Sequence, residues 1–304
     1  GLVQRFTQRP ARRARWSLGG PDVRHPLTDE QAATVAAVAE AAAASRYAPL
    51  LLEGVTGSGK TEVYLRCLEA VLEHGRTGLV LVPEIGLTPA ASGAVERRFG
   101  DRVAVLHSAQ SEGDRWLEWQ RVRDRQATIV VGPRSALFAP LADLGLIVVD
   151  EEHDAAYKQQ EAPRYHARDL ALVLGHRLAV PVLLCSATPS VEAEALVARG
   201  LARRLRLTRR VAGGELPEVE LVDLRSEQPE PGEQGRTLYS RRLREALAET
   251  LERGEQAILL MQRRGWAPLV QCRDCGHRME CPDCSVSLVS HQRSNDLRCH
   301  YCGY

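Results

Sequence analysis

The chain has 304 residues and a formal net charge of +1; 44% of its residues are hydrophobic and 26% are charged. This balance is typical of a globular protein and excludes a disordered one, and the length allows one large domain or two medium ones. No apolar run approaches the roughly 20 residues of a membrane-spanning helix, and no signal peptide opens the chain. Because the net charge is close to zero, any basic surface must be local.

The first 26 residues are rich in arginine and in residues that favour turns. We expect residues 1–26 to be a linker that follows an upstream domain missing from this chain. From Leu27 the pattern changes to helix, and Thr28 with Gln31 three positions later forms a capping box at its start. Gln31 could instead reach forward to the edge of an adenine, but on these residues alone capping is the default interpretation.

A phosphate-binding motif, G-x-x-x-x-G-K-[ST], lies between an apolar run at 48–53 and an amphipathic helical pattern at 62–74. This motif requires strand, glycine loop and helix in that order, because the glycines and the helix N-terminus turn backbone N–H groups toward phosphate oxygens. Lys60 would reach the β- and γ-phosphates, and the Thr61 hydroxyl would bind Mg²⁺. The predicted site for ATP with Mg²⁺ comprises Gly54, Val55, Thr56, Gly57, Ser58, Gly59, Lys60 and Thr61.

Short apolar runs, separated by segments of helix length, follow this motif at 78–83, 103–107, 127–131, 144–149 and 181–186. The alternation predicts an α/β fold with a mostly parallel sheet. In such a fold, functional residues lie in loops at the carboxyl ends of the strands.

The run at 144–149 leads directly into the acidic box Asp150-Glu151-Glu152-His153. We expect Asp150 to hold Mg²⁺, directly or through water, and Glu151 to polarise the attacking water. The candidate catalytic residues are Lys60, Asp150, Glu151 and His153. The run at 181–186 ends in Ser186-Ala187-Thr188, which by itself indicates only a turn. After a phosphate loop and a D-E-x-H box, it resembles the coupling motif of superfamily 2 helicases.

Six of the eight cysteines form three C-x-x-C pairs. This spacing indicates metal binding in a reducing cytoplasm, whereas Cys67 and Cys185 fit core positions. The candidate metal ligands are Cys272, Cys275, Cys281, Cys284, Cys299 and Cys302, with His277, His291 and His300 taken as surface residues. Tetrahedral zinc needs four ligands, and the second and third pairs have close to the usual ribbon spacing. Joining the first pair to the third would leave the middle pair without a partner.

The composition turns to glycine, proline and glutamate at 211–235, where we expect a hinge interrupted by a short strand at Leu221–Leu224. A helix at Leu238–Arg253 and a strand at Gln256–Met261 should follow. The expected organisation is a linker at 1–26, a nucleotide-binding lobe at 27–210, the hinge, the start of a second lobe at 236–270 and an incomplete zinc region at 271–304.

Four longer stretches resemble one family nearly verbatim. They are Val82–Pro89, Gly132–Phe138, Asp150–Asp154 and Tyr157–Asp169. The chain resembles the PriA family of bacterial replication-restart helicases from about Leu27 to Tyr304. The resemblance implies two RecA-like lobes, of which this chain holds the first and the start of the second. An upstream DNA-binding region and the rest of the second lobe, with its catalytic arginine, would be missing.

The same resemblance assigns roles to single residues. Gln31 would recognise the nucleotide, and 157–169 would be an aromatic-rich loop that senses single-stranded DNA. In that loop, tyrosines can stack on bases and basic side chains can meet phosphates. The candidate DNA-coupling residues are Arg134, Tyr157, Lys158, Arg164, Tyr165, Arg168, Ser186 and Thr188. A second zinc would join Cys272 and Cys275 to a fourth cysteine pair beyond this chain, which leaves one complete site here.

The resemblance implies an ATP-dependent 3′–5′ DNA helicase that acts at stalled forks and starts primosome assembly. Its partners would be single-stranded and forked DNA, other primosome proteins and single-stranded-DNA-binding protein, in the cytoplasm. A second hypothesis is a DNA-binding assembly platform without motor activity, which the intact Lys60, Asp150 and Glu151 argue against. A small-molecule kinase is disfavoured by the cysteine pairs and the D-E-x-H box.

Overall fold

The computed structural model describes residues 22, 24–83, 89–107, 110–211, 213, 218–224, 239–260, 270, 272, 275–284, 286–291, 296–299 and 302–304. The chain divides into two compact units, Gly1–Glu215 and Leu216–Tyr304, here called the N-terminal and C-terminal units. The division lies inside the segment 211–235 that the sequence predicts as a hinge. Residues 1–21, 225–238 and 261–269, and with them most of the expected linker and most of the hinge, lie outside the described residues.

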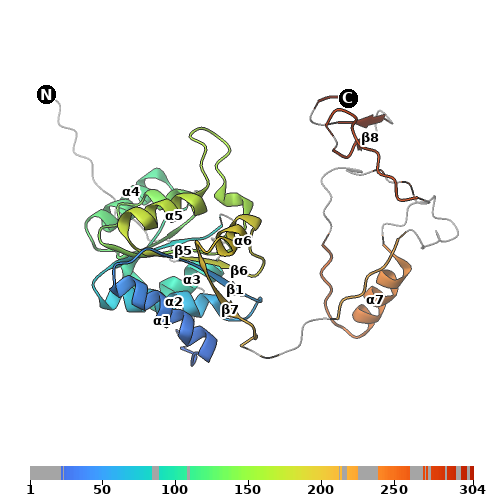
Figure 1. The fold of residues 1–304 in the computed structure, drawn as a ribbon. Coiled ribbons are helices and arrows are strands. Elements are labelled where there is room, and N and C mark those ends of the chain that lie inside the picture. The colour runs from blue at the N-terminus through green and yellow to red at the C-terminus, as the bar shows by residue number, and fades with distance from the viewer. Residues whose placement is uncertain are drawn as a thin grey trace. The chain divides into compact units, whose positions relative to one another are not determined.

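A seven-stranded sheet forms the centre of the N-terminal unit (Figure 1). Every strand pair in it is parallel, and the order is β3-β4-β2-β5-β6-β1-β7. The strands are β1 (Ala48–Gly54), β2 (Thr77–Leu81), β3 (Val103–Val105), β4 (Ile129–Gly132), β5 (Leu144–Val149), β6 (Pro181–Ser186) and β7 (Arg203–Leu207). Because all strands run the same way, their carboxyl ends meet at one edge. The α/β fold of the RecA-like class is confirmed.

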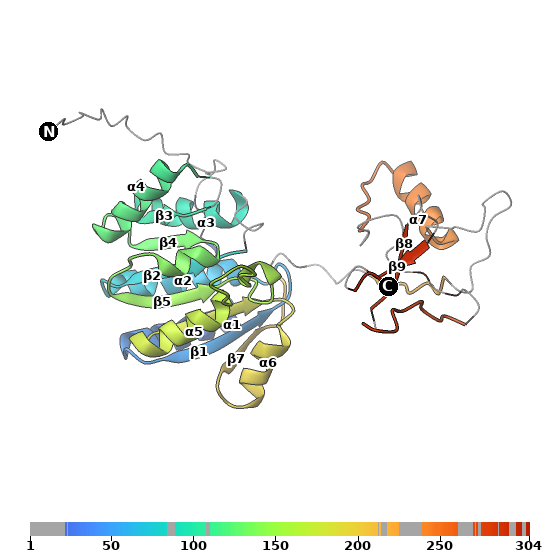
Figure 2. The ribbon, with the colours of Figure 1, turned by 90° about the horizontal axis from the view of Figure 1, so that it is seen from above.

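Helices cover both faces of this sheet (Figures 1 and 2). One face packs against α1 (Asp29–Ala43), α2 (Lys60–Glu73) and α3 (Pro89–Phe99), and the other against α4 (Glu112–Arg123), α5 (Ala167–Leu178) and α6 (Val191–Ala198). Successive residues of β1 alternate between the two cores, with Leu50 and Leu52 in one and Leu51 in the other. Burial on both faces explains why these strands appear in the sequence as continuous apolar runs.

The strand β7 was not predicted from the sequence. Its residues alternate between arginine and leucine toward the end, so that Leu205 and Leu207 are buried while Arg203 and Arg206 are exposed. It pairs only with β1 in this sheet and forms its edge. An edge strand with one solvated face lacks the long apolar run that reveals the central strands.

The C-terminal unit contains α7 (Arg241–Glu252) and a hairpin of β8 (Val289–His291) and β9 (Asp296–Arg298). The helix confirms the prediction at Leu238–Arg253, but the strand predicted at Gln256–Met261 is wrong for 256–260, where Ile258 is 98% exposed. Likewise Leu221–Leu224 forms no strand. A strand needs a neighbour for its backbone N–H and C=O groups, and none of the described strands pairs with either segment. No described helix is both long and apolar enough to cross a bilayer.

Candidate nucleotide site and metal centre

The phosphate loop joins the end of β1 to the start of α2, as the motif requires. Gly57 and Gly59 have φ values of +81° and +83°, a region that only glycine adopts without strain. The Lys60 Nζ atom donates a 2.8 Å hydrogen bond to the Gly54 carbonyl, which holds the ammonium group within the loop. A phosphate at this point would meet the N-terminus of α2 and the Lys60 charge together.

Gln31 connects α1 to the phosphate loop. Its Oε1 atom accepts from the Thr28 N–H at 2.9 Å, and the Thr28 hydroxyl accepts from the Gln31 N–H, so the predicted capping box is confirmed. Its Nε2 atom donates to the Ser58 carbonyl at 2.9 Å. A β-carbon on Gly59 would lie 2.5 Å from that nitrogen, so a larger residue there would displace the Gln31 amide. Both ends of the amide therefore have partners, and contact with a nucleotide remains a prediction.

The acidic box continues the sheet beyond β5. The Asp150 N–H bonds to the Leu81 carbonyl at 2.9 Å, and the Glu152 N–H bonds to the Cys185 carbonyl at 3.0 Å, so the turn is held between β2 and β6. Burial, with the charge of Glu151, raises the pKa of Asp150 to about 6, while the Lys60 ammonium opposes this shift. An acid in this setting gains from a cation such as Mg²⁺ beside it.

Glu151, between these two anchored residues, has φ +45°. A left-handed conformation at a residue other than glycine costs on the order of 1–3 kcal/mol and persists only where its surroundings impose it. Its backbone N–H donates to Asp150 Oδ1 at 3.1 Å, and its side chain is 42% exposed. The carboxylate predicted to activate water is therefore accessible while its backbone is fixed.

His153 and Ser186 join the acidic box to the next strand. The His153 Nδ1 atom lies 2.8 Å from Ser186 Oγ, and Ser186 Oγ accepts from the Thr188 N–H at 3.0 Å. Ser186 is fully buried, so it can reach DNA only through other residues. The structure thus brings together two motifs that lie 33 residues apart in the sequence.

Glu152 was counted among the acids of the box but received no role from the sequence. Its carboxylate is fully buried and accepts from the Ser190 N–H at 2.7 Å and the Ser190 hydroxyl at 2.8 Å. Arg168 Nη1 lies 3.3 Å from Glu152 and donates to Ser190 Oγ at 2.7 Å. Ser190 also caps α6. A third acid directly after the two candidate catalytic acids was the signal in the sequence, but its partners were not predictable.

The aromatic-rich segment 157–169 differs in part from the expectation. Tyr157 is fully buried and its hydroxyl donates to the Asp150 carbonyl at 2.5 Å, so stacking of this ring on a base is wrong for this structure. Arg168, 4% exposed and paired with Glu152, is not placed to meet phosphates either. Tyr157 lies at one end of the segment and Arg168 near the other, and both side chains are buried in the core.

Between these ends the chain forms a hairpin at 158–166, visible in Figure 1 as the yellow-green loop. Lys158 bridges to His166, and the Gln159 N–H bonds to the Tyr165 carbonyl at 2.8 Å. Lys158 and Arg164 are exposed, and Tyr165 is half-buried. These three side chains stay accessible, and their contact with nucleic acid remains a prediction. Arg134 donates to the Ala156 carbonyl at 2.8 Å, next to the start of this hairpin.

A four-cysteine cluster occupies the C-terminal unit. The Sγ atoms of Cys281, Cys284, Cys299 and Cys302 all lie within 4.8 Å of one another. Zinc–sulfur bonds of about 2.3 Å in a tetrahedron place sulfur atoms roughly 3.8 Å apart, so the arrangement fits this metal. Backbone bonds from Cys281 to Val286 and from Cys299 to Tyr304 shape the two turns.

This cluster agrees with the division of the cysteines expected from the sequence. Among the described residues, Cys272, Cys275 and His277 are not part of it. His300 lies outside the described residues.

Comparisons with known proteins agree with this geometry. The family described as DEAD/DEAH box helicase matches residues 28–196, and the family described as PriA DNA helicase Cys-rich region domain matches residues 281–304. Replication restart protein PriA of Bacillus subtilis is 45% identical over 92% of this chain and 34% of its own length. PriA of Treponema pallidum is 45% identical over 92% of this chain and 41% of its own length. PriA of Synechocystis is 45% identical over 85% of this chain and 32% of its own length.

The chain thus spans about a third to two fifths of the length of these relatives. The family matches cover the nucleotide site and the cysteine cluster, the two places where the structure gathers its functional side chains. The chain belongs to the DEAD/DEAH box helicase family, and the resemblance to its PriA members is confirmed.

Proposed function

We propose that this chain is the ATP-binding part of a 3′–5′ DNA helicase that acts in replication restart. Its lobe would bind Mg-ATP at one edge of the sheet and respond to a single strand of DNA. Stalled or repaired forks would be the substrate, and primosome proteins and single-stranded-DNA-binding protein would be the partners, in the cytoplasm. These finer assignments rest on the family to which the chain belongs.

The convergence of Lys60, Asp150 and Glu151 carries the proposal. Lys60 begins α2, after the loop that follows β1, while Asp150 and Glu151 follow β5. The strands β1 and β5 are separated only by β6, and Lys60 is near enough to influence the pKa of Asp150. Lys60 would hold the β- and γ-phosphates, while Thr61 and Asp150 would hold Mg²⁺. Mg²⁺ supplies charge neutralisation on the phosphates, and Glu151 would take up the proton of the attacking water.

Two contacts support a coupling role for the hairpin at 158–166. On one side Tyr157 bonds to the Asp150 carbonyl, and on the other Arg168 pairs with Glu152. The two ends of the hairpin thus contact the residues on either side of Glu151. A strand of DNA held by Lys158, Arg164 and Tyr165 would act on the position of Glu151 through these contacts, with His153 and Ser186 linking the box to the 186–188 turn.

The four-cysteine cluster would hold one structural Zn²⁺. All four ligand positions of tetrahedral zinc are filled by protein, which is typical of structural sites and leaves no position for a substrate. A second zinc through Cys272 and Cys275, with ligands outside this chain, remains a proposal.

The test is nucleotide binding followed by hydrolysis. A fluorescent ATP analogue with Mg²⁺ should bind this chain, Lys60→Ala should abolish binding, and Glu151→Gln should bind but not hydrolyse. Phosphate release measured on the full-length protein, with and without single-stranded DNA, separates a motor from an assembly platform. Binding of DNA with no binding of ATP by the unsubstituted chain would favour the platform and contradict our proposal.

A further inference from the structure

The segment that follows β7 contacts both the phosphate loop and the start of α1. The Val211 N–H donates to the Gly57 carbonyl in the loop at 3.0 Å. Three residues earlier, Thr208 bonds to the Glu30 carboxylate of α1, through its N–H at 2.8 Å and its hydroxyl at 2.7 Å. The backbone of this segment is therefore held at both ends, and both anchors lie at the predicted nucleotide site.

Arg210 lies between these two anchors, and its side chain reaches the phosphate loop. A β-carbon on Gly57 would lie 3.9 Å from Arg210 Cγ. Arg210 is half-buried, its Nε atom is buried without a hydrogen-bond partner, and it forms no salt bridge within the described part of the chain. A guanidinium group that is partly withdrawn from water loses solvation, and here no group of the protein compensates for that loss.

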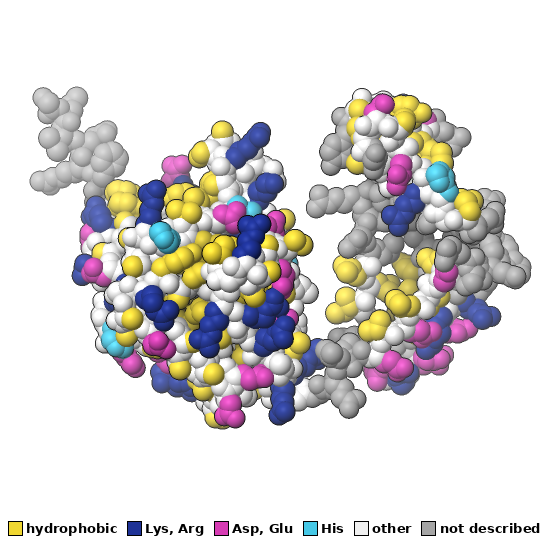
Figure 3. All heavy atoms as spheres, in the orientation of Figure 1, with side chains coloured by type: hydrophobic (Ala, Val, Ile, Leu, Met, Phe, Trp, Pro, Cys, Tyr) yellow, Lys and Arg dark blue, Asp and Glu magenta, His cyan; other side chains and the backbone are white. Residues whose placement is uncertain are grey.

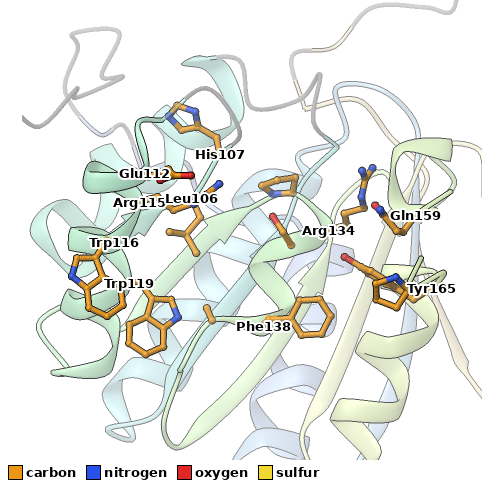
Figure 4. A pocket seen from close by; sticks show the side chains of 14 residues that line it. Leu106, His107, Glu112, Arg115, Trp116, Trp119, Arg134, Phe138, Gln159 and Tyr165 are labelled. Atoms are coloured by element: carbon orange, nitrogen blue, oxygen red, sulfur yellow. The ribbon is translucent and has the colours of Figure 1, made fainter. Parts of the chain in front are cut away.

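Other arginines of the N-terminal unit show how such a charge is otherwise compensated. Arg98, with a side chain 1% exposed, pairs with three carboxylates, and Arg168 pairs with a buried one. Arg134, which lines a groove between α4 and the hairpin at 158–166 (Figure 4), donates to a backbone carbonyl. Figure 3 shows further Lys and Arg side chains at the surface, where water solvates them. Among the described arginines that are not exposed, only Arg210 has no partner.

We propose that Arg210 is a nucleotide-binding residue, whose guanidinium group contacts the phosphates of ATP held in the loop at 54–61. The loop turns its backbone N–H groups toward phosphate oxygens, so an anion held there would supply the partner that the protein does not. Guanidinium and phosphate groups form charge-assisted hydrogen bonds that are often bidentate. The face of the adenine ring is the other group that a guanidinium could meet, but a neutral ring compensates a charge less well than an anion does.

The assignment of Arg210 rests on the proposed function and adds a residue to its nucleotide site. In the sequence, Arg210 is one of six arginines between positions 199 and 210, and nothing there separates it from its solvated neighbours. It also lies shortly before Glu215, where the N-terminal unit ends. A nucleotide bound by Arg210 would therefore contact the chain just before it leaves this unit.

The test is the nucleotide affinity of the whole chain, measured with a fluorescent ATP analogue and Mg²⁺. Arg210→Ala should weaken binding about 10- to 150-fold, the range expected for hydrogen bonds to a charged group. Arg210→Lys keeps the charge but not the planar fork of donors, so its affinity should lie between the two. Arg209→Ala is the matched control, because it removes an exposed arginine from the adjacent position, and it should leave the affinity nearly unchanged.

Two further measurements separate a phosphate contact from other roles of Arg210. Inosine triphosphate keeps the phosphates and changes the base, so in competition with the analogue it should lose as much affinity in Arg210→Ala as ATP does. Without nucleotide, Arg210→Ala should melt no lower than the unsubstituted chain, because it removes a charge that has no partner in the protein. At one fixed concentration of Mg-ATP, its melting temperature should rise less than that of the unsubstituted chain.

The possible results distinguish the role of Arg210 from the proposed function as a whole. If the unsubstituted chain binds Mg-ATP and Arg210→Ala binds it as tightly as Arg209→Ala does, the assignment of Arg210 is overturned and the proposed function stands. A loss of affinity for ATP without a loss for inosine triphosphate would place Arg210 at the base, and a lower melting temperature without nucleotide would give it a structural role; each result contradicts the phosphate contact. Absence of Mg-ATP binding by the unsubstituted chain would contradict the proposed function, and the assignment of Arg210 with it.

Discussion

The buried pair of Arg168 and Glu152 gives the sharpest prediction about the site. Arg168→Ala removes a guanidinium group that is 95% shielded and leaves the Glu152 carboxylate, which is fully buried, with only the two Ser190 donors. Removing one partner of a buried pair costs about 3–5 kcal/mol, because the remaining charge is uncompensated. The retained Ser190 bonds place our expectation near the lower end, at about 3 kcal/mol.

In a unit of this size, a loss of about 3 kcal/mol lowers the melting temperature by roughly 6–12 °C. The assay is thermal and urea unfolding of the chain, followed by far-ultraviolet circular dichroism and by tryptophan emission. Arg46→Ala is the matched control, since Arg46 and Glu40 form an exposed pair with side chains 57% and 77% accessible. That pair should contribute less than about 1 kcal/mol.

A second substitution tests the mechanism by whether it raises or lowers the stability of Arg168→Ala. Glu152→Gln added to Arg168→Ala removes the stranded charge while keeping the shape and the hydrogen bond from the Ser190 N–H. The double variant should therefore be more stable than Arg168→Ala alone. If the double variant is less stable, or if Arg168→Ala resembles Arg46→Ala, the buried pair does not exist in solution and Arg168 regains its place as a DNA contact.

Three further predictions concern the nucleotide site and the metal centre. Tyr157→Phe keeps the ring but leaves the Asp150 carbonyl without its hydroxyl partner, so stability should fall by about 1 kcal/mol and phosphate release should slow even without DNA; an unchanged basal rate would separate Tyr157 from the nucleotide site. Gln31→Ala should weaken Mg-ATP binding more than Thr28→Ala, measured by the fluorescent analogue, because each removes one bond of the capping box but only the first removes the bond to Ser58; equal effects would make Gln31 a cap alone. Metal analysis should return one tightly held zinc per chain, lost in Cys281→Ser and retained in Cys272→Ser, since structural zinc contributes roughly 10–16 kcal/mol of apparent binding energy; two tight zinc ions would contradict the division of the cysteines.

The features predicted correctly from the sequence share a local cause. The phosphate loop, the capping box at Thr28 and the C-x-x-C pairs at 281–284 and 299–302 each depend on residues within a few positions of one another. The central strands were recognisable because burial on both faces makes every residue apolar. The strand β7 was missed because its outer face is solvated, and the strand expected at 256–260 was assigned from apolar residues that the structure leaves exposed.

The roles of Tyr157 and Arg168 could not be predicted for a different reason. In the sequence, Tyr157 and Arg168 look as suitable for binding nucleic acid as Lys158, Arg164 and Tyr165 do. Whether each side chain points outward depends on the ends of the hairpin, which η4 (Ala155–Tyr157) and α5 anchor to the sheet. Because the two ends are anchored, Tyr157 bonds to the Asp150 carbonyl and Arg168 pairs with Glu152, while Lys158 and Arg164 between them remain accessible.

The same segment therefore divides into two kinds of residue, those at the ends that hold Glu151 in place and those between that are free to meet a strand. Substitutions at the ends are expected to change stability and basal hydrolysis, and substitutions at Lys158 or Arg164 only the response to DNA. That division follows from burial and contact, neither of which is a property of residue type.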